Sequence, residues 1–381
     1  MIATPVQHVL QGHADLEATE RGTRPHRLPV AVRTRFPDPQ LMMAEGQPSG
    51  VRLVFTTEAR RIELDLHTTR VAYRSTARPR GRVDLVVDRT IADSVELGAG
   101  DLIEIDLTTG GTEHLPGQAE TVRFQDLPVG AKRVEIWLPH NESVELGELR
   151  TDAAVEPVPA RTRWVHHGSS ISQGSNAVSP ARTWPATVAR AADVNLVNLG
   201  FGGSAMVDPF VARVIRDRPA DLISLKFGIN VVNLDAMRRR ILVPALHGFL
   251  DTVRDGHPET PLVLISALHC AIHEDTPGPG AIDPASIGTD QVRFVASGRS
   301  GDTELGRLTL GVVREALAEV AAVRDDPHLH LLDGLSLYGP DDAAEHPLLD
   351  GLHPDAETHQ RVAERFSAWA FGDDRPFGPK R

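Results

Sequence analysis

The chain has 381 residues, a formal charge of −12 at neutral pH, 41% hydrophobic and 24% charged residues, and no run of 18 apolar residues. This composition excludes a disordered, collagen-like or multi-span membrane protein, and the acidic balance argues against nucleic-acid binding. The single cysteine, Cys270, excludes an internal disulfide and a cysteine-rich zinc site. At about 150 residues per domain, the length predicts two domains.

The first thirty residues contain neither a secretory signal nor a membrane anchor, so we expect a cytoplasmic protein with no membrane partner. Arginine outnumbers lysine by 37 to three, a bias that points to a GC-rich bacterial genome.

Short segments between residues 51 and 150 alternate hydrophobic and polar side chains, which is typical of strands with one buried face. The alternating hydrophobic sets are Ile62, Leu64 and Leu66; Ile103, Ile105 and Leu107; and Val134, Ile136 and Leu138. With turn residues between them, they predict an antiparallel, jelly-roll-like β-sandwich over residues 1–155.

This sandwich is either a structural accessory domain or a carbohydrate-binding module. Sugar binding usually needs exposed aromatic side chains, and we expect most of the few aromatics before residue 151 to be buried. They are Phe36, Phe55, Tyr73, Phe124 and Trp137.

The pattern changes after residues 151–162, a segment with two prolines and no periodicity that we interpret as a linker. Apolar strand-like segments at 164–170, 194–200, 222–228, 262–269 and 329–334 then alternate with predicted helices at 184–192, 207–216, 236–255, 303–323 and 355–370. This alternation predicts an α/β domain over residues 160–375, with a parallel sheet covered on both faces and ligands at the carboxyl ends of its strands. Residues 274–302 have no period and predict a lid or binding loop.

The first of these strands ends in Gly168-Ser169-Ser170, where glycine allows a tight turn that can expose a serine hydroxyl above the sheet. Asp350 precedes His353 by three residues, just before the last predicted helix. At that spacing an aspartate can orient a histidine, which can then act as base toward a serine. Asp333 is an alternative partner for the histidine, and we prefer Asp350 because its spacing is short and fixed.

Two further polar segments follow predicted strands, the glycine-rich 198–204 and Phe227-Gly228-Ile229-Asn230. Backbone N–H groups of glycine and the amide of asparagine can both donate to an oxyanion. Serine, glycine, asparagine and aspartate–histidine thus occur at the carboxyl ends of successive strands, where this architecture places its active sites.

These four blocks, GSSIS at 168–172, NLGFGGS at 198–204, GIN at 228–230 and DGLHP at 350–354, resemble those of the SGNH hydrolases, also called GDSL esterases and lipases. The resemblance covers residues 163–370 and implies a flavodoxin-like three-layer α/β/α domain. It also implies Ser170 as nucleophile, His353 as general base and acid, Asp350 as its partner, and an oxyanion hole formed by Ser170 N–H, Gly203 N–H and the Asn230 side chain. Ser169 replaces the usual aspartate of the first block, and Val231 replaces an aspartate that often follows the asparagine.

A sandwich ahead of such a domain resembles a subset that contains sugar-ester deacetylases and a polyketide-tailoring acyltransferase. The resemblance implies a serine esterase acting on a small-molecule or carbohydrate ester or an acyl thioester, without a cofactor or metal. Acyl transfer to a hydroxyl of a natural product is the alternative, and a non-catalytic carbohydrate-binding protein is a third hypothesis.

Three histidines, His167, His269 and His273, are candidates for the substrate pocket. His269 and His273 lie four residues apart around Cys270, but no third metal ligand accompanies them, so we predict no metal site. We interpret Cys270 as a small apolar filler.

Overall fold

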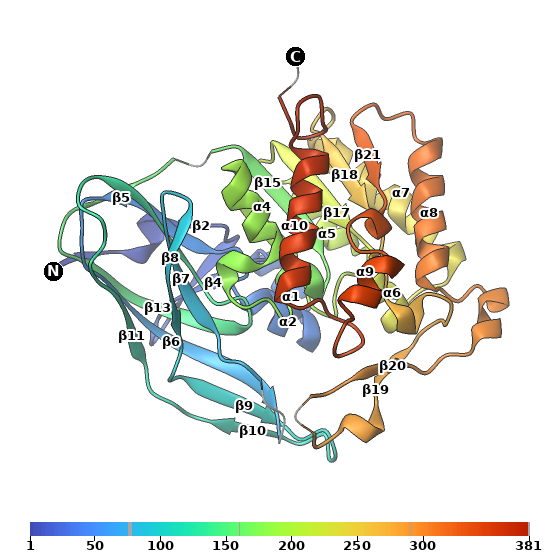
Figure 1. Cartoon of the computed structure of the whole chain (residues 1–381), viewed down its shortest axis with the longest axis horizontal. Coiled ribbons are helices and arrows are strands. Elements are labelled where there is room, and N and C mark those ends of the chain that lie inside the picture. Colours follow the sequence, from blue (N-terminus) through green and yellow to red (C-terminus); the bar gives the residue numbers. More distant parts are fainter. Residues whose placement is uncertain (75–77, 160, 290, 380–381) are drawn as a thin grey trace.

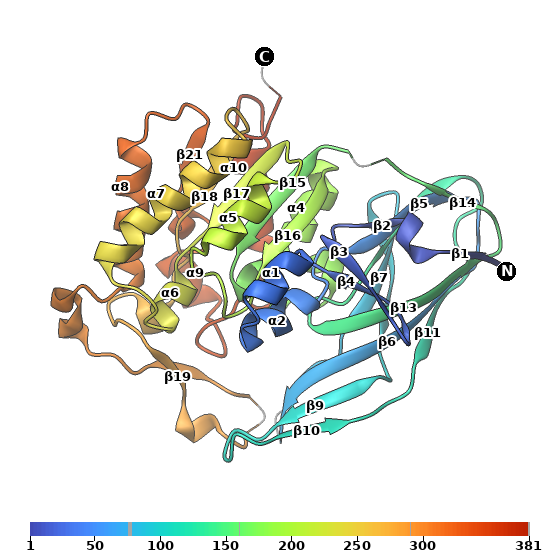
Figure 2. The ribbon, with the colours of Figure 1, turned by 180° about the vertical axis from the view of Figure 1, so that it is seen from behind.

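The computed structural model describes residues 1–74, 78–159, 161–289 and 291–379. Strands dominate the N-terminal half, and helices surround a central sheet in the C-terminal half (Figures 1 and 2). Residue 160, where the second domain is predicted to begin, lies outside the described residues. In the described parts of the chain, no helix is long and apolar enough to cross a membrane.

Two sheets form the N-terminal half. In the first, the strand order is β10-β9-β6-β13-β4-β3, with β1 beside β13 and β11 beside β6. In the second, the order is β14-β5-β12-β7-β8, with β2 beside β5. The first sheet comprises β1 (Ile2–Thr4), β3 (Asp15–Thr19), β4 (Gly22–His26), β6 (Ile62–Tyr73), β9 (Asp101–Ile105), β10 (Thr112–Leu115), β11 (Glu120–Phe124) and β13 (Glu142–Thr151). The second comprises β2 (Leu10–Gln11), β5 (Arg52–Thr57), β7 (Arg82–Val87), β8 (Thr90–Glu96), β12 (Lys132–Trp137) and β14 (Val155–Pro157).

The predicted β-sandwich is confirmed, since one buried hydrophobic cluster contains side chains of both sheets, among them Leu64 of β6 and Ile136 of β12. The described strand pairs of these sheets are antiparallel except β6 and β9, which run parallel. Leu107 lies outside the predicted strand, because β9 ends at Ile105 and residues 107–109 form a turn.

Two helices that the alternation pattern did not predict, α1 (Val30–Arg35) and α2 (Pro39–Gly46), connect β4 to β5. Their hydrophobic residues belong to the core of the other half: Leu41 and Ala44 share a buried cluster with Val197 and Leu199. In both figures these helices lie against the C-terminal half. The N-terminal half therefore contributes side chains to the hydrophobic core of the domain that follows it.

The C-terminal half contains a five-stranded parallel sheet in the order β16-β15-β17-β18-β21. Every residue of β16 and β17 is buried, which explains their continuous hydrophobic character. The strands are β15 (Arg163–Gly168), β16 (Asn195–Gly200), β17 (Leu222–Lys226), β18 (Leu262–Ile265) and β21 (Leu329–Leu332).

Helices cover both faces of this sheet and give the predicted three layers. Buried residues of α5 (Pro209–Arg216), α7 (Arg239–Gly256) and α8 (Leu310–Val323) form one cluster, and those of α4 (Trp184–Ala192) and α10 (Ala356–Ala370) form another. Short helices α3 (Ser170–Gln173), α6 (Ile229–Asn233) and α9 (Pro340–Glu345) complete the domain. Single 3₁₀ turns span Val6–His8, Pro180–Arg182, Ala271–His273, Pro284–Ser286, Ser300–Leu305 and Gly334–Ser336. The helix predicted from residue 303 begins only at Leu310, because residues 300–305 form one of these turns.

The predicted loop of residues 274–302 contains two short antiparallel strands, β19 (Gly280–Ile282) and β20 (Phe294–Ala296). The backbone N–H of Phe294 donates a 2.8 Å hydrogen bond to the carbonyl oxygen of Asp350. The segment is thereby fastened to the turn that carries the predicted Asp–His pair.

Candidate active site

Ser170 is the first residue of α3, directly after β15. The turn between strand and helix needs glycine at position 168, because a Cβ there would lie 2.3 Å from Ser172 Oγ. Gly174 ends the helix in a left-handed conformation at φ 118°. The Ser170 side chain therefore lies at the carboxyl edge of the sheet, and the residue is 8% exposed.

Three side chains that the sequence predicts to act together form one hydrogen-bonded chain. Ser170 Oγ lies 3.0 Å from His353 Nε2, and His353 Nδ1 lies 2.8 Å from Asp350 Oδ2. The other carboxylate oxygen of Asp350 accepts from the backbone N–H groups of Leu352 (2.8 Å) and His353 (2.7 Å). This geometry allows the imidazole to take a proton from the serine hydroxyl.

The Asp350 carboxyl is kept ionised by its surroundings. Burial acts to raise its pKa, but the hydrogen bonds and charge of His353, with the two backbone N–H groups, outweigh burial and lower the pKa below the ordinary value. Asn176 Nδ2 donates a further hydrogen bond of 3.3 Å to Asp350 Oδ2. Asp333, the alternative partner, instead accepts from Ser266 Oγ and from the N–H of Leu335.

The three groups predicted to donate to an oxyanion have no acceptor among the described residues. Gly203 has φ +71°, a conformation that favours glycine, and no described residue accepts a hydrogen bond from its N–H. Asn230 is buried in the first turn of α6, where its Oδ1 accepts from Ala205 N–H at 3.1 Å; no described residue accepts from its Nδ2. Ser170 N–H is at a helix start and has no intrahelical acceptor.

Residues from the N-terminal half hold the loop that carries Gly203. Arg27, fully buried after β4, donates to the carbonyl oxygens of Asn198 (3.1 Å) and Gly200 (2.6 Å), and its guanidinium lies over the Phe201 ring. Gln40 Nε2 donates to Gly202 O at 2.8 Å. Burial lowers the Arg27 pKa to about 9, and nearby Glu45 offsets part of that effect.

Sequence reasoning missed Arg27, Gln40 and Asn176. Nothing in their local sequence marks them, because each acts across a long separation in the chain.

None of the three histidines predicted to line the substrate pocket lines either of the two cavities described below. His167 is fully buried: its Nδ1 contacts Leu199 O at 2.7 Å, and its ring packs on Phe227 and Phe249. Burial lowers the pKa of His167 to about 4, so the ring is neutral at pH 7. The structure places this residue in the core rather than in the predicted substrate pocket, because Phe249 of α7 packs on its ring from the helical layer on that face of the sheet.

His273 is also buried, between Thr276 O (3.1 Å) and Asn233 Oδ1 (3.2 Å), and holds the start of the 274–302 segment. His269 Nδ1 lies 3.3 Å from Glu274 Oε1. Cys270 is buried, and burial followed by the charge of Glu274 raises its pKa to about 12. In the described part of the chain, no three His, Cys, Asp or Glu side chains group as a metal site would require.

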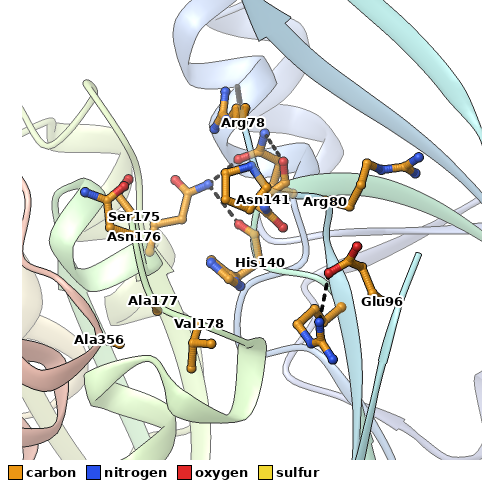
Figure 3. A pocket seen from close by; sticks show the side chains of 14 residues that line it. Arg78, Arg80, Glu96, His140, Asn141, Ser175, Asn176, Ala177, Val178 and Ala356 are labelled. Atoms are coloured by element: carbon orange, nitrogen blue, oxygen red, sulfur yellow. Dashed lines mark hydrogen bonds and ion pairs between the residues drawn. The ribbon is translucent and has the colours of Figure 1, made fainter. Parts of the chain in front are cut away.

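Two cavities adjoin this arrangement. The first, of about 430 Å³, lies between the two halves: Arg78, Arg80, Glu96, His140 and Asn141 line one side, and Ser175–Val178 with Ala356 line the other (Figure 3). We call it the interdomain cavity.

The second cavity, of about 320 Å³, is lined by Gly203 itself, and we call it the Phe36 pocket. Its other lining residues are Phe36, Asp38, Gln40, Leu41, Ser204, Met206, Asp208, Phe210, Leu234 and Ala236.

An aromatic side chain covers the histidine. The ring of Phe294 on β20 lies 5.7 Å from the ring of His353, nearly perpendicular to it. Since the backbone of Phe294 is also bonded to Asp350, the 274–302 segment contacts both residues of the Asp–His pair.

Two family models match the chain. Residues 161–274 match the GDSL-like lipase/acylhydrolase family, and residues 9–146 match the N-terminal domain of SsfX3. No curated protein sequence matches the chain.

Among solved structures, the chain is similar to the salicylyl-acyltransferase SsfX3 from a tetracycline biosynthetic pathway, with 27% identity over 93% of this chain and 92% of that one and a TM-score of 0.75. It shares its fold with a protein of Bacteroides ovatus named as a GDSL-like lipase (20% identity, 96% and 95% coverage, TM-score 0.67). A family two carbohydrate esterase from Clostridium thermocellum, solved with cellohexaose, has the same fold (13% identity, 84% and 91% coverage, TM-score 0.55). With its four sequence blocks and its two-domain fold, the chain is similar to the GDSL-like lipases and acylhydrolases, whose family model matches residues 161–274.

Proposed function

We propose that the protein is a serine-dependent esterase in which Ser170 is the nucleophile, His353 the general base and acid, and Asp350 the residue that orients His353. The observation that carries this proposal is the hydrogen-bonded chain from Ser170 Oγ through His353 to Asp350. A serine hydroxyl is a weak nucleophile unless a positioned base removes its proton, and this chain supplies that base.

The reaction proceeds by two displacements. Ser170 Oγ bonds to the acyl carbon while its proton passes to His353 Nε2. The bond from that carbon to the leaving oxygen or sulfur then breaks, and His353 returns the proton to the leaving group. Water then bonds to the acyl carbon while one of its protons passes to His353. The bond from that carbon to Ser170 Oγ breaks, His353 returns the proton to Oγ, and the carboxylic acid leaves. The N–H groups of Ser170 and Gly203 and the Asn230 amide stabilise the oxyanion at both stages.

The substrate we propose is an ester of a small molecule or a carbohydrate, or an acyl thioester. The match to the GDSL-like lipase/acylhydrolase family and the fold shared with a carbohydrate esterase support this range of substrates. The single cysteine and the arginine-rich composition support a bacterial cytoplasmic setting.

Acyl transfer to a hydroxyl is a second candidate, favoured by the cover over the site. Phe294 packs on His353, Ser170 is 8% exposed, and such a cover keeps water from the acyl-enzyme. The similarity to a salicylyl-acyltransferase over most of both chains supports the same candidate.

The test uses Ser170→Ala with Ser175→Ala as the matched control. Ser170→Ala lowers kcat on p-nitrophenyl esters about 10⁴- to 10⁶-fold and abolishes labelling by a fluorophosphonate, whereas Ser175→Ala retains both. Activity near the wild-type level in Ser170→Ala contradicts the proposal. An unlabelled wild-type chain favours the non-catalytic hypothesis instead. Partition of the acyl-enzyme between water and an added alcohol then separates hydrolysis from transfer.

A further inference from the structure

The Phe36 pocket lies on one particular side of the reacting carbon. It is lined by Gly203, and by Leu234 and Ala236, which follow Asn230 in the chain. It therefore adjoins the oxyanion donors. None of its described lining residues comes from the turn that carries Asp350 and His353.

The acyl chain and the leaving group are both bonded to the carbonyl carbon of the substrate and extend from it in different directions. The leaving group receives its proton from His353 Nε2, so it lies on the side of His353 and Phe294. The acyl chain receives no proton from His353 and stays bonded to the reacting carbon, beside the oxyanion. The Phe36 pocket is thus on the acyl side.

The lining of this pocket is hydrophobic and comes from both halves of the chain. Phe36 and Leu234 are 54% and 53% exposed, so the two of them offer apolar surface at the mouth of the pocket. The rings of Phe36 and Phe210 lie 4.9 Å apart. A volume of about 320 Å³ is at the small end of ligand sites, so the occupant is compact.

The charged groups that line the pocket have one sign. Asp38 and Asp208 are present, and none of the described lining residues is Arg, Lys or His. Asp38 accepts from Leu41 N–H at the start of α2. The Asp208 side chain makes no capping bond to α5. Burial raises the pKa of Asp208 to about 6; a hydrogen bond from the backbone of Met206 offsets part of that rise, and the charge of Asp38 adds to it. An anionic acyl group would meet like charge here with no cation to compensate.

We propose that the Phe36 pocket, formed jointly by α1–α2 and the α/β domain, is the acyl-binding site and selects compact, uncharged, apolar acyl groups such as benzoyl or branched short chains. This inference rests on the proposed function and adds the substrate class. It assigns the N-terminal half a direct part in specificity through Phe36.

The experiment measures kcat/KM for p-nitrophenyl acetate, butyrate, benzoate and monosuccinate. Phe36→Ala and Leu234→Ala each remove one wall of the pocket, from opposite halves of the chain, and Met43→Ala on α2 is the control because it lines a different cavity. We expect each pocket variant to lower the benzoate-to-acetate ratio about 10-fold, with Met43→Ala leaving the ratio unchanged.

A second comparison tests whether the pocket disfavours anionic acyl groups. Monosuccinate reacts at least about 10-fold more slowly than butyrate in the wild type, and Asp208→Asn narrows that gap. Unchanged ratios in both wall variants, or a succinyl ester as good as butyryl, overturn the pocket assignment.

Mass spectrometry of the acyl-enzyme distinguishes failure of the pocket assignment from failure of the proposed serine mechanism. If the esters acylate Ser170 but the ratios do not respond, the pocket assignment fails and the serine mechanism stands. If no ester acylates Ser170, the proposed function fails, and the pocket assignment fails with it.

Discussion

The guanidinium of Arg27 donates a 2.6 Å hydrogen bond to the carbonyl oxygen of Gly200, at the end of the strand that leads to Gly203. A fully buried cation from the N-terminal half thus ties down the loop that carries Gly203, whose N–H we propose as an oxyanion donor. Oxyanion donors contribute most when they are held in place before the reaction, because no reorganisation is then needed. The N-terminal half is in this sense part of the scaffold of the proposed active site.

Arg27→Met should lower kcat about 10-fold or more while KM changes little, because the positioning of Gly203 is lost and the two carbonyls lose their buried donor. Arg27→Lys should recover part of the loss, and Arg35→Met, an exposed arginine of α1, should have no effect. Affinity for a boronic acid that mimics the tetrahedral intermediate reports the same loss without depending on turnover. If stability falls but boronate affinity and kcat are unchanged, Arg27 is purely structural.

Asp350→Asn should lower kcat about 10³- to 10⁴-fold, because an amide cannot stabilise the imidazolium that forms on His353. Asp333→Asn is the matched control: Asp333 caps a 3₁₀ turn and contacts Ser266, so its loss should change kcat less than about 3-fold. Steady-state rates of the two purified variants decide between the carboxylates. A larger effect at position 333 would contradict the assignment of Asp350.

Phe294→Ala should shift an acyl-enzyme toward hydrolysis, because the ring that packs 5.7 Å from His353 is removed and water gains access. The measurement is the ratio of ester to acid formed from p-nitrophenyl benzoate in the presence of glycerol or methanol. Val295→Ala, the next residue on β20, is the control. A product ratio identical in all three proteins would mean that this segment does not control water.

Asp342→Asn should destabilise the fold in a pH-dependent way. The hydrogen bonds of Arg365 to Asp342 (2.6 and 2.9 Å) lower the pKa of Asp342 to about 2, below the value of an unfolded chain. The stabilisation is therefore present above about pH 4 and is lost as pH falls toward 2.

At pH 7 the variant should lose about 2 kcal/mol of unfolding free energy, measured by urea denaturation, and the difference should shrink below pH 4. Asp341→Asn in the same helix is exposed and should cost less than about 1 kcal/mol. A difference between Asp342→Asn and the wild type that stays constant down to pH 3 would contradict this account.

Local patterns in the chain were sufficient for the architecture and for the Ser–His–Asp chain. The buried strands of the α/β domain are continuous apolar segments, and its helices begin within a few residues of the predicted positions, apart from the one that starts at Leu310. Ser170, Asp350 and His353 could be singled out because a parallel sheet brings the carboxyl ends of its strands to one edge. Where the pattern was short or irregular, as at Leu107, the assignment was wrong.

Other properties depend on contacts between distant segments, which periodicity does not encode. The assignment of α1 and α2 to the second hydrophobic core, the bond of Arg27 to Gly200 and the Phe36 pocket join residues more than 150 positions apart. The burial of His167 likewise depends on a distant segment, since Phe249 of α7 packs on its ring. The residue types at the active site are thus legible in the primary structure, because local chain geometry and sheet topology bring them together. The contacts that hold the Gly203 loop and that form the Phe36 pocket arise only when the two halves pack, since burial and close approach are properties of the folded whole.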